Sequence, residues 1–265
     1  MEKISIPSKF YFSMKNSNVL IFAFLIMALI FKFMSWPGAA IVLTLSLALL
    51  AVLLIAKSIN LFKTQDSLKF LPLLLALLTI SFLFKIMHWP AANILIITSM
   101  VGLFVEFIRF SIKSRKSISA LVPLAFGVSL VFVLFKVMHW PHSALFLKLI
   151  YSLFLVATPL ALFNFYTKLK GKDNAEANQF ARIGVLTTIY LLLEVVLIFF
   201  PEGLVAPHFV LRIGLIIVVS LVLALLSKIR AINGFKERFK LENNFTRILS
   251  TAFLIVLLIQ VLIAK

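Results

Sequence analysis

The chain has 265 residues, of which 63% are hydrophobic and only 13% are charged, and its mean hydropathy is +1.14. Soluble domains carry about 25% charged residues, so the composition excludes an ordinary water-soluble protein and predicts an all-α integral membrane protein. The absence of cysteine excludes disulfide bonds, thiolate metal sites and a cysteine nucleophile.

The net charge is strongly positive, with 26 Lys and Arg against nine Asp and Glu, which gives +17. In a soluble protein this balance would indicate nucleic acid as the partner. In a membrane protein, basic residues gather in short cytoplasmic loops, where they contact anionic lipid. We therefore expect the lipid bilayer and anionic lipids at the cytoplasmic face as partners, and no nucleic acid.

Taken in chain order, about nine apolar segments are long enough to cross the bilayer, whose hydrocarbon core is about 30 Å thick. They cover approximately residues 18–34, 37–56, 68–87, 90–110, 118–138, 141–166, 182–200, 208–227 and 246–264. The first follows three lysines, as in a signal peptide, but it lacks a small-residue cleavage site and continues into further spans. We interpret it as a retained signal anchor.

The basic residues occur in alternate connections between these segments, around residues 57–69, 109–116, 168–182 and 228–247. Because Lys and Arg mark cytoplasmic loops, these loops and the N-terminus are predicted to be cytoplasmic. The other connections are then periplasmic. The expected location is the inner (cytoplasmic) membrane, crossed many times.

One motif occurs at three of the predicted periplasmic turns: FKFMSWP at residues 31–37, FKIMHWP at 84–90 and FKVMHWP at 135–141. The motif lysines are 53 and 51 residues apart, which is enough for two spans and a loop, and such a period indicates an internal repeat.

The repeat predicts two regions of the chain. Residues 1–166 should hold three tandem helical hairpins, at about 18–56, 68–110 and 118–166. Residues 167–265 should form a C-terminal membrane region of about three helices. Its first two spans, joined by PEGLVAPH, are either a diverged fourth hairpin or an unrelated pair.

The motif residues suit a turn at the membrane surface. Pro is favoured in the first turn of a helix and disfavours helical backbone before it, so one helix should end near each Trp and the next begin at each Pro. Trp is enriched at the headgroup level. The lysine and the histidine three residues later should share a helical face. The repeated turn residues are Lys32, Trp36, Pro37, Lys85, His88, Trp89, Pro90, Lys136, His139, Trp140 and Pro141.

Two interpretations of this motif remain open. One is an interfacial anchor, in which the lysine extends its ammonium group to the membrane surface. The other is a polar layer that handles ions or contacts a partner helix. Ser35 takes the place of histidine in the first repeat.

The stretch FKIMHWPAA, followed by an apolar helix, resembles the N-terminal transmembrane hairpin of the GldL and PorL subunits of the gliding-motility and type IX secretion motor of Bacteroidota. In that family a short periplasmic turn carries a K-x-M-H-W-P-G-type signature. The resemblance covers the three hairpins and is specific at the turn. It implies hairpins that surround the helices of a second membrane protein and take part in a proton-driven motor.

The resemblance also implies a glutamate in the second helix of the hairpin that couples proton flow to rotation. The corresponding positions here hold Leu50, Leu103 and Phe154. Glu106, which follows Lys85 by 21 residues, is either a displaced equivalent of that glutamate or the partner of Arg109 in an ordinary i,i+3 ion pair.

Ionisable residues inside the spans indicate functional positions by default, because burying a charge in lipid is costly. Glu194 and Arg212 lie at similar depths on neighbouring spans, which predicts either a structural salt bridge or a transport site. Lys148, the motif lysines and Arg212 would form a cationic layer. Such a layer suits an anion, a lipid headgroup or a carboxylate of another subunit better than a cation pore.

No enzyme motif is present: the sequence lacks HExxH, a phosphate-binding glycine-rich loop and GxSxG. We expect no catalysis, cofactor or metal site. The leading hypothesis is a non-enzymatic inner-membrane protein with GldL-like hairpins, which packs with itself or a membrane partner in gliding, type IX secretion or a proton-driven motor. The alternative is a transporter or channel with an intramembrane polar pathway.

Overall fold

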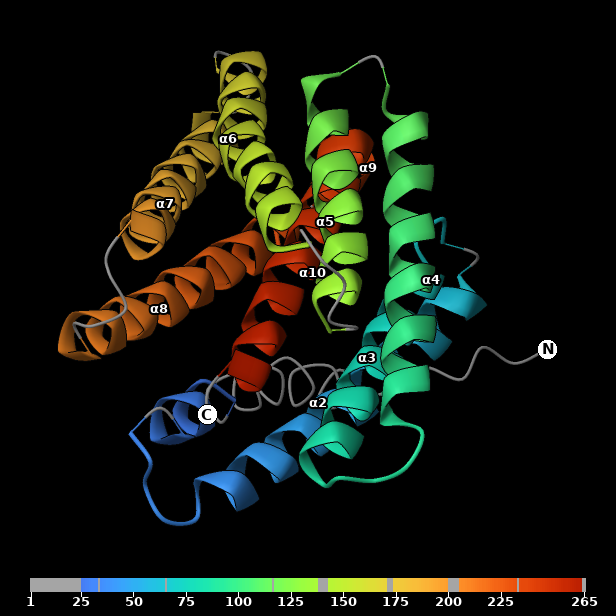
Figure 1. The fold of residues 1–265 in the computed structure, drawn as a ribbon. Coiled ribbons are helices and arrows are strands. Elements are labelled where there is room, and N and C mark those ends of the chain that lie inside the picture. The colour runs from blue at the N-terminus through green and yellow to red at the C-terminus, as the bar shows by residue number, and fades with distance from the viewer. Residues whose placement is uncertain are drawn as a thin grey trace. The chain divides into compact units, whose positions relative to one another are not determined.

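The computed structural model describes residues 25–32, 34–64, 66–115, 117–137, 143–170, 174–199, 205–232 and 234–263. This part of the chain is helical and contains no strand (Figure 1). Residues 25–32 are helical and are followed by α2 (Ala39–Lys63), α3 (Phe70–Ile86), α4 (Ala92–Lys113), the 3-10 turn η1 (Ile118–Ala120), α5 (Leu121–Val137), α6 (Ser143–Leu169), α7 (Asn174–Phe199), α8 (Val205–Arg230), α9 (Phe235–Arg238) and α10 (Lys240–Ile263).

Six helical segments among the described residues are long and apolar enough to cross a membrane. They are Ala39–Lys63, Ala92–Lys113, Ile118–Phe135, Ser152–Leu169, Leu211–Arg230 and Lys240–Ile259, and α3 is a shorter apolar helix. The all-helical, multi-pass membrane class is thereby confirmed. The count of nine spans and their orientation stay predictions.

Two helices begin earlier than predicted. The start of α7 is at Asn174 rather than near residue 182, and that of α10 is at Lys240 rather than near residue 246. Both helices have a glutamate in the first turn, where a negative charge stabilises the positive end of the helix dipole. Apolar residues indicate only the part of a helix that lies in lipid. The predicted spans therefore did not include the polar first turns of α7 and α10.

The chain divides into two compact units, Met1–Leu95 with Gln260–Lys265, and Ile96–Ile259. In the first unit α2 packs against α3. The Phe62 and Phe70 rings meet edge to face at 5.2 Å, and the Ser58 hydroxyl donates to the Lys69 carbonyl oxygen at 3.3 Å. These contacts close the loop between the two helices.

The second unit is built around aromatic side chains from five helices. Phe107 of α4 meets Phe126 of α5 at 5.2 Å between ring centres, and Phe126 meets Phe154 of α6 at 4.8 Å. Phe253 of α10 then lies 6.1 Å from Phe154 and 5.6 Å from Tyr190 of α7. Because lipid offers no hydrophobic driving force between helices, close packing of this kind holds them together.

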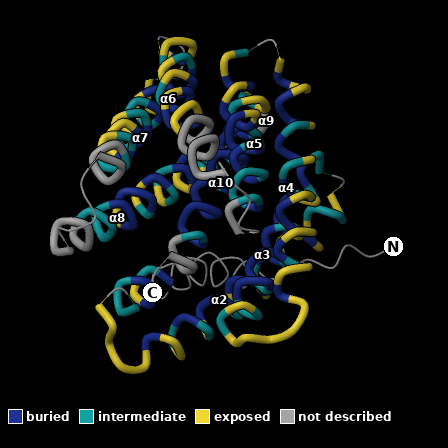
Figure 2. The backbone as a smooth tube through the Cα atoms, viewed as in Figure 1, coloured by how far each residue is buried: buried dark blue, intermediate teal, exposed yellow. Residues whose placement is uncertain are grey.

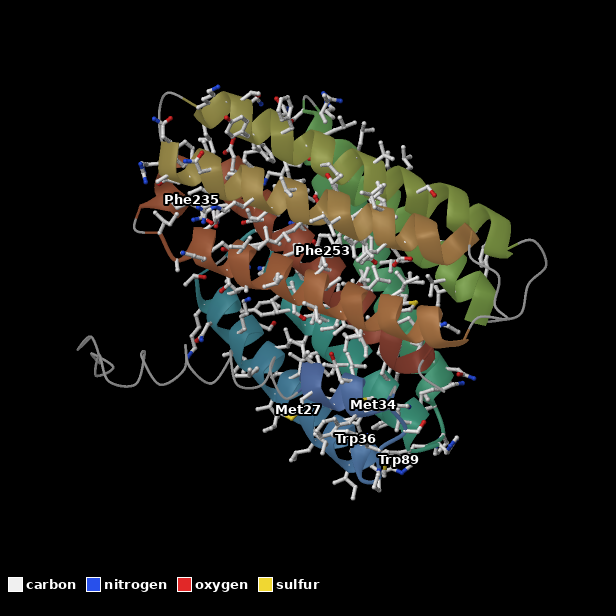
Figure 3. All side chains as sticks on the ribbon, turned by 90° about the vertical axis from the view of Figure 1, so that its left-hand side faces the viewer. Met27, Met34, Trp36, Trp89, Phe235 and Phe253 are labelled. Atoms are coloured by element: carbon white, nitrogen blue, oxygen red, sulfur yellow. The ribbon has the colours of Figure 1, made fainter. Side chains whose placement is uncertain are left out.

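The last helix lies in the interior of this unit. Every residue from 251 to 258 is buried (Figure 2), and Figure 3 shows Phe253 inside the unit. The apolar pattern of a helix does not show whether lipid or other helices cover it, so sequence reasoning did not identify α10 as the core.

The short helix α9 closes one end of the same unit and was not predicted. Its Phe235 is fully buried and lies 6.3 Å from Phe180 of α7. Arg238 forms a 2.9 Å ion pair with Glu176 in the first turn of α7.

The predicted end of the third hairpin, residue 166, lies near the end of α6, and the division of the chain into repeats stays a prediction. That helix packs against both α5 and α7, and its Phe165 contacts Phe180 and Phe245 at 5.7 and 4.9 Å. The sequence repeat is defined by the similar Trp-Pro motifs, whereas the compact units are defined by contacts between helices. The two divisions of the chain therefore differ.

Candidate functional sites at the turns and inside the helices

The first two Trp-Pro turns, residues 31–38 and 84–91, have the same backbone hydrogen bonds. In each turn the Trp N–H donates to the Phe carbonyl oxygen, and the residue before Trp donates to the Lys carbonyl oxygen. The distances are 3.0 Å (Trp36 to Phe31), 3.1 Å (Ser35 to Lys32), 2.9 Å (Trp89 to Phe84) and 3.3 Å (His88 to Lys85). This pair of bonds defines the Schellman motif, which ends a helix with a residue of positive φ.

Ser35 and His88 are the residues of positive φ, at 53° and 54°. The Schellman motif is usually accompanied by an apolar contact between the residues that its longer hydrogen bond joins. Here these residues are Phe and Trp. Their ring centres are 4.6 Å apart in the first turn and 4.9 Å in the second, which gives a physical reason for the repeated Phe-to-Trp spacing.

The role predicted for proline is wrong in detail. Pro37 and Pro90 lie in the turn itself, followed by Gly38 and Ala91 with φ of 81° and 68°. The following helices α2 and α4 begin one residue later still. The preceding helix also ends before Trp, because the Schellman motif needs a left-handed residue between helix and Trp.

The third turn lies between the described parts of the chain, because α5 is described as far as Val137 and α6 from Ser143. His139, Trp140 and Pro141 lie outside the described residues, and so do the side-chain positions of Lys136 and Lys148.

The prediction that Lys85 and His88 share a helical face is wrong, because His88 lies beyond the helix end with left-handed backbone. The two side chains nevertheless line one open groove of about 600 Å³, together with Asn93 of α4. The Lys85 Nζ donates to Asn93 Oδ1 at 3.0 Å, which links the two helices across the turn.

The tryptophans of both turns are half exposed, Trp36 at 48% and Trp89 at 49%. Figure 3 shows them at the same end of the first unit. Half-exposed Trp at a helix end is typical of residues at the membrane–water interface.

Glu106 is the acidic residue inside the second hairpin, and it forms a local ion pair. The Arg109 Nη1 lies 3.0 Å from Glu106 Oε1, while Glu106 is only 7% exposed. The positions at which the resemblance implies the coupling glutamate are occupied by fully or almost fully buried apolar side chains, namely Leu50, Leu103 and Phe154. Of the two alternatives for Glu106, the structure contains the ion pair with Arg109.

Glu194 lies in a polar contact that sequence reasoning missed. The Tyr190 hydroxyl donates to Glu194 Oε1 at 2.6 Å, and Tyr190 is fully buried. Arg212 of α8, which packs against α7, attracts the Glu194 carboxylate electrostatically. The four-residue spacing of Tyr and Glu on one helix would have been the signal for this contact.

Comparison with known proteins identifies no family for this chain. No family model, curated protein or solved structure matches this chain. Within the described residues no group of three His, Cys, Asp or Glu is placed to hold a metal ion. The resemblance to GldL and PorL therefore rests on the turn motif.

Proposed function

We propose that the chain is a non-enzymatic inner-membrane subunit built from tandem hairpins similar to those of GldL and PorL, and that it packs with itself or with a membrane partner. The observation that carries the proposal is the common Schellman turn made by the repeated Phe, Lys, Trp and Pro residues. Such a turn ends one helix and begins the next within a few residues, which is the local geometry that a helical hairpin needs.

The outer face of α2 supports the same function. Ile41, Leu45 and Val52 are 74%, 61% and 65% exposed, so this helix presents a broad apolar surface. Lipid can cover the surface, and so can a helix of a partner subunit.

A link to gliding, type IX secretion or a proton-driven motor is part of the proposal, with a structural rather than a proton-coupling role. An isoleucine- and leucine-rich hairpin without the family glutamate can hold partner helices. It has no carboxylate of its own at Leu50, Leu103 or Phe154 with which to carry a proton.

The test is purification of the tagged chain from native membranes in mild detergent, followed by mass measurement and identification of co-purifying chains. We expect a homo-oligomer or a stoichiometric membrane partner that is missing from a control purification of an unrelated tagged membrane protein. A monodisperse monomer without a partner would contradict the proposal.

The second candidate function is a transporter or channel, and the contact between Tyr190, Glu194 and Arg212 favours it. The Glu194 carboxylate accepts a hydrogen bond from a buried tyrosine and is attracted by an arginine on the next helix. Ionisable groups placed in this way inside a membrane protein often line the path of an ion or substrate.

Ion flux in proteoliposomes tests this second function. If it holds, Glu194→Gln and Tyr190→Phe abolish proton or ion flux, while Glu106→Gln, which alters a local ion pair elsewhere, leaves it intact. Absence of flux together with a recovered partner would favour the scaffold instead.

A further inference from the structure

The three Trp-Pro turns carry different polar side chains at two positions near the motif lysine. The residue before Trp is Ser35 in the first turn and histidine in the other two. The second residue of the following helix is Asn93 in the second turn, whereas the corresponding residues are Ala40 and Ala144. Only the second turn combines the lysine with both a histidine and an asparagine.

These side chains meet in the groove described above. Lys85, His88 and Asn93 line it beside the ring of Trp89, and the bond from Lys85 Nζ to Asn93 Oδ1 holds the ammonium group at the groove. Its volume of about 600 Å³ lies in the range of small-ligand sites.

The groove offers hydrogen-bond donors and no carboxylate. An ammonium group has three N–H donors, and one of them goes to Asn93. The asparagine amide adds two donors and the imidazole ring of His88 adds an N–H donor. None of the residues that line the groove is Asp or Glu.

Like Ser35 in the first turn, His88 has the left-handed backbone that the Schellman turn requires. Its φ of 54° is left-handed, a conformation that costs a residue with a side chain about 1–2 kcal/mol and that glycine adopts freely. The turn thus places the His88 side chain at the groove, where the first turn has a serine.

We propose that the groove of the second turn binds a phosphate oxyanion, supplied either by the headgroup of an anionic phospholipid or by free inorganic phosphate. The donors match phosphate oxygens, and charge-assisted hydrogen bonds to phosphate are among the stronger ones in proteins. Half-exposed Trp89 places the groove at the level of lipid phosphates. The site does not depend on the function proposed above.

The experiment uses the full chain in nanodiscs and reads binding at one turn at a time. Two proteins each keep a single tryptophan, at Trp89 or at Trp36, with the other two replaced by Phe so that the aromatic contact of each turn remains. Quenching by phosphatidylglycerol with brominated acyl chains is compared with quenching by brominated phosphatidylcholine.

We expect Trp89 to be quenched preferentially by phosphatidylglycerol, and Trp36 to show no preference. Lys85→Gln should weaken the preference about tenfold, because one charge-assisted hydrogen bond of about 1.5 kcal/mol is lost. Asn93→Ala, which changes no charge, should weaken it less. Lys32→Gln in the Trp36 protein is the matched control and should have no effect.

Added inorganic phosphate separates the two sources of the oxyanion. Recovery of Trp89 fluorescence on its addition indicates that the free ion also occupies the groove, and no recovery assigns the groove to the lipid headgroup. Equal preference at Trp36 and Trp89, or a preference that survives both Lys85→Gln and Asn93→Ala, would overturn the proposal. Circular dichroism of each variant checks that the helices are retained.

Discussion

The Trp-Pro turns and the aromatic interior of the second unit show two ways in which one chain stabilises helices. In each described turn the backbone hydrogen bonds of the Schellman motif and the ring contact join residues no more than five positions apart. In the interior, Phe253 meets Phe154 and Tyr190, which lie far away in the sequence. The first kind of structure repeats wherever its motif repeats, whereas the second exists once and depends on the whole unit.

The largest effect is expected in the interior, on changing Phe253 to alanine. Phe253 is 1% exposed, and its loss leaves a cavity between three helices. We expect a loss of about 3 kcal/mol in stability, at the lower end of the range for buried phenylalanines, because the unfolded helix would still lie in apolar lipid. Reversible unfolding in mixed micelles measures it. Leu160→Ala, on an exposed position of α6, is the control, and an equal loss there would refute an interior role for α10.

A smaller loss is expected where α4 and α5 approach each other. A Cβ added at Gly127 would lie 3.1 Å from Phe107 Cβ, whereas one added at Gly184 would lie 3.8 Å from Leu162 Cβ. Gly127→Ala should therefore cost about 1–3 kcal/mol through overpacking. Gly184→Ala should be neutral or stabilise by up to about 1 kcal/mol through helix propensity. The same unfolding assay compares them, and similar values for both would argue against the close approach.

At the turn, replacing His88 by glycine should stabilise the protein by about 1 kcal/mol, because glycine adopts the left-handed backbone without strain. Ser35→Gly should do the same at the first turn, since φ is nearly equal at the two positions. Thermal unfolding in detergent measures both. A loss of stability in His88→Gly alone would mean that the imidazole supports the turn structurally, contrary to a binding role.

The smallest effect is expected after the prolines, where Gly38 and Ala91 both have positive φ. Ala91→Gly should stabilise the second turn by about 0.5–1 kcal/mol, and Gly38→Ala should destabilise the first by a similar amount. We predict that the two substitutions change the free energy of unfolding with opposite signs in the same assay. The same sign for both changes would show that the turns differ in backbone as well as in side chains.

The sequence allowed prediction of the local parts of this structure. Apolar length indicated the membrane class, and the repeated motif located the two turns that the structure describes. The spacing of Glu106 and Arg109 gave their ion pair as one of two alternatives. The Schellman geometry was missed, although Phe and Trp five residues apart encode it, because proline was taken as the start of the next helix.

The remaining features depend on contacts between residues far apart in the sequence. The apolar pattern of one helix does not show which other helices cover it, so neither the burial of α10 nor the ring contacts of Phe253 could be predicted. The groove at Lys85 and Asn93 was missed for a related reason. It depends on a contact between the end of one helix and the start of the next.

The central claim is that the three Trp-Pro turns are one repeated unit on one face of the membrane, and the absence of cysteine from the chain allows a direct test. Single variants Ser35→Cys, His88→Cys and His139→Cys are treated in spheroplasts with a membrane-impermeant maleimide, alongside Thr64→Cys and Ser117→Cys in the intervening loops. We predict labelling of the three turn positions in intact spheroplasts and labelling of the two loop positions only after permeabilisation. Labelling of turn positions from opposite sides of the membrane would contradict the account.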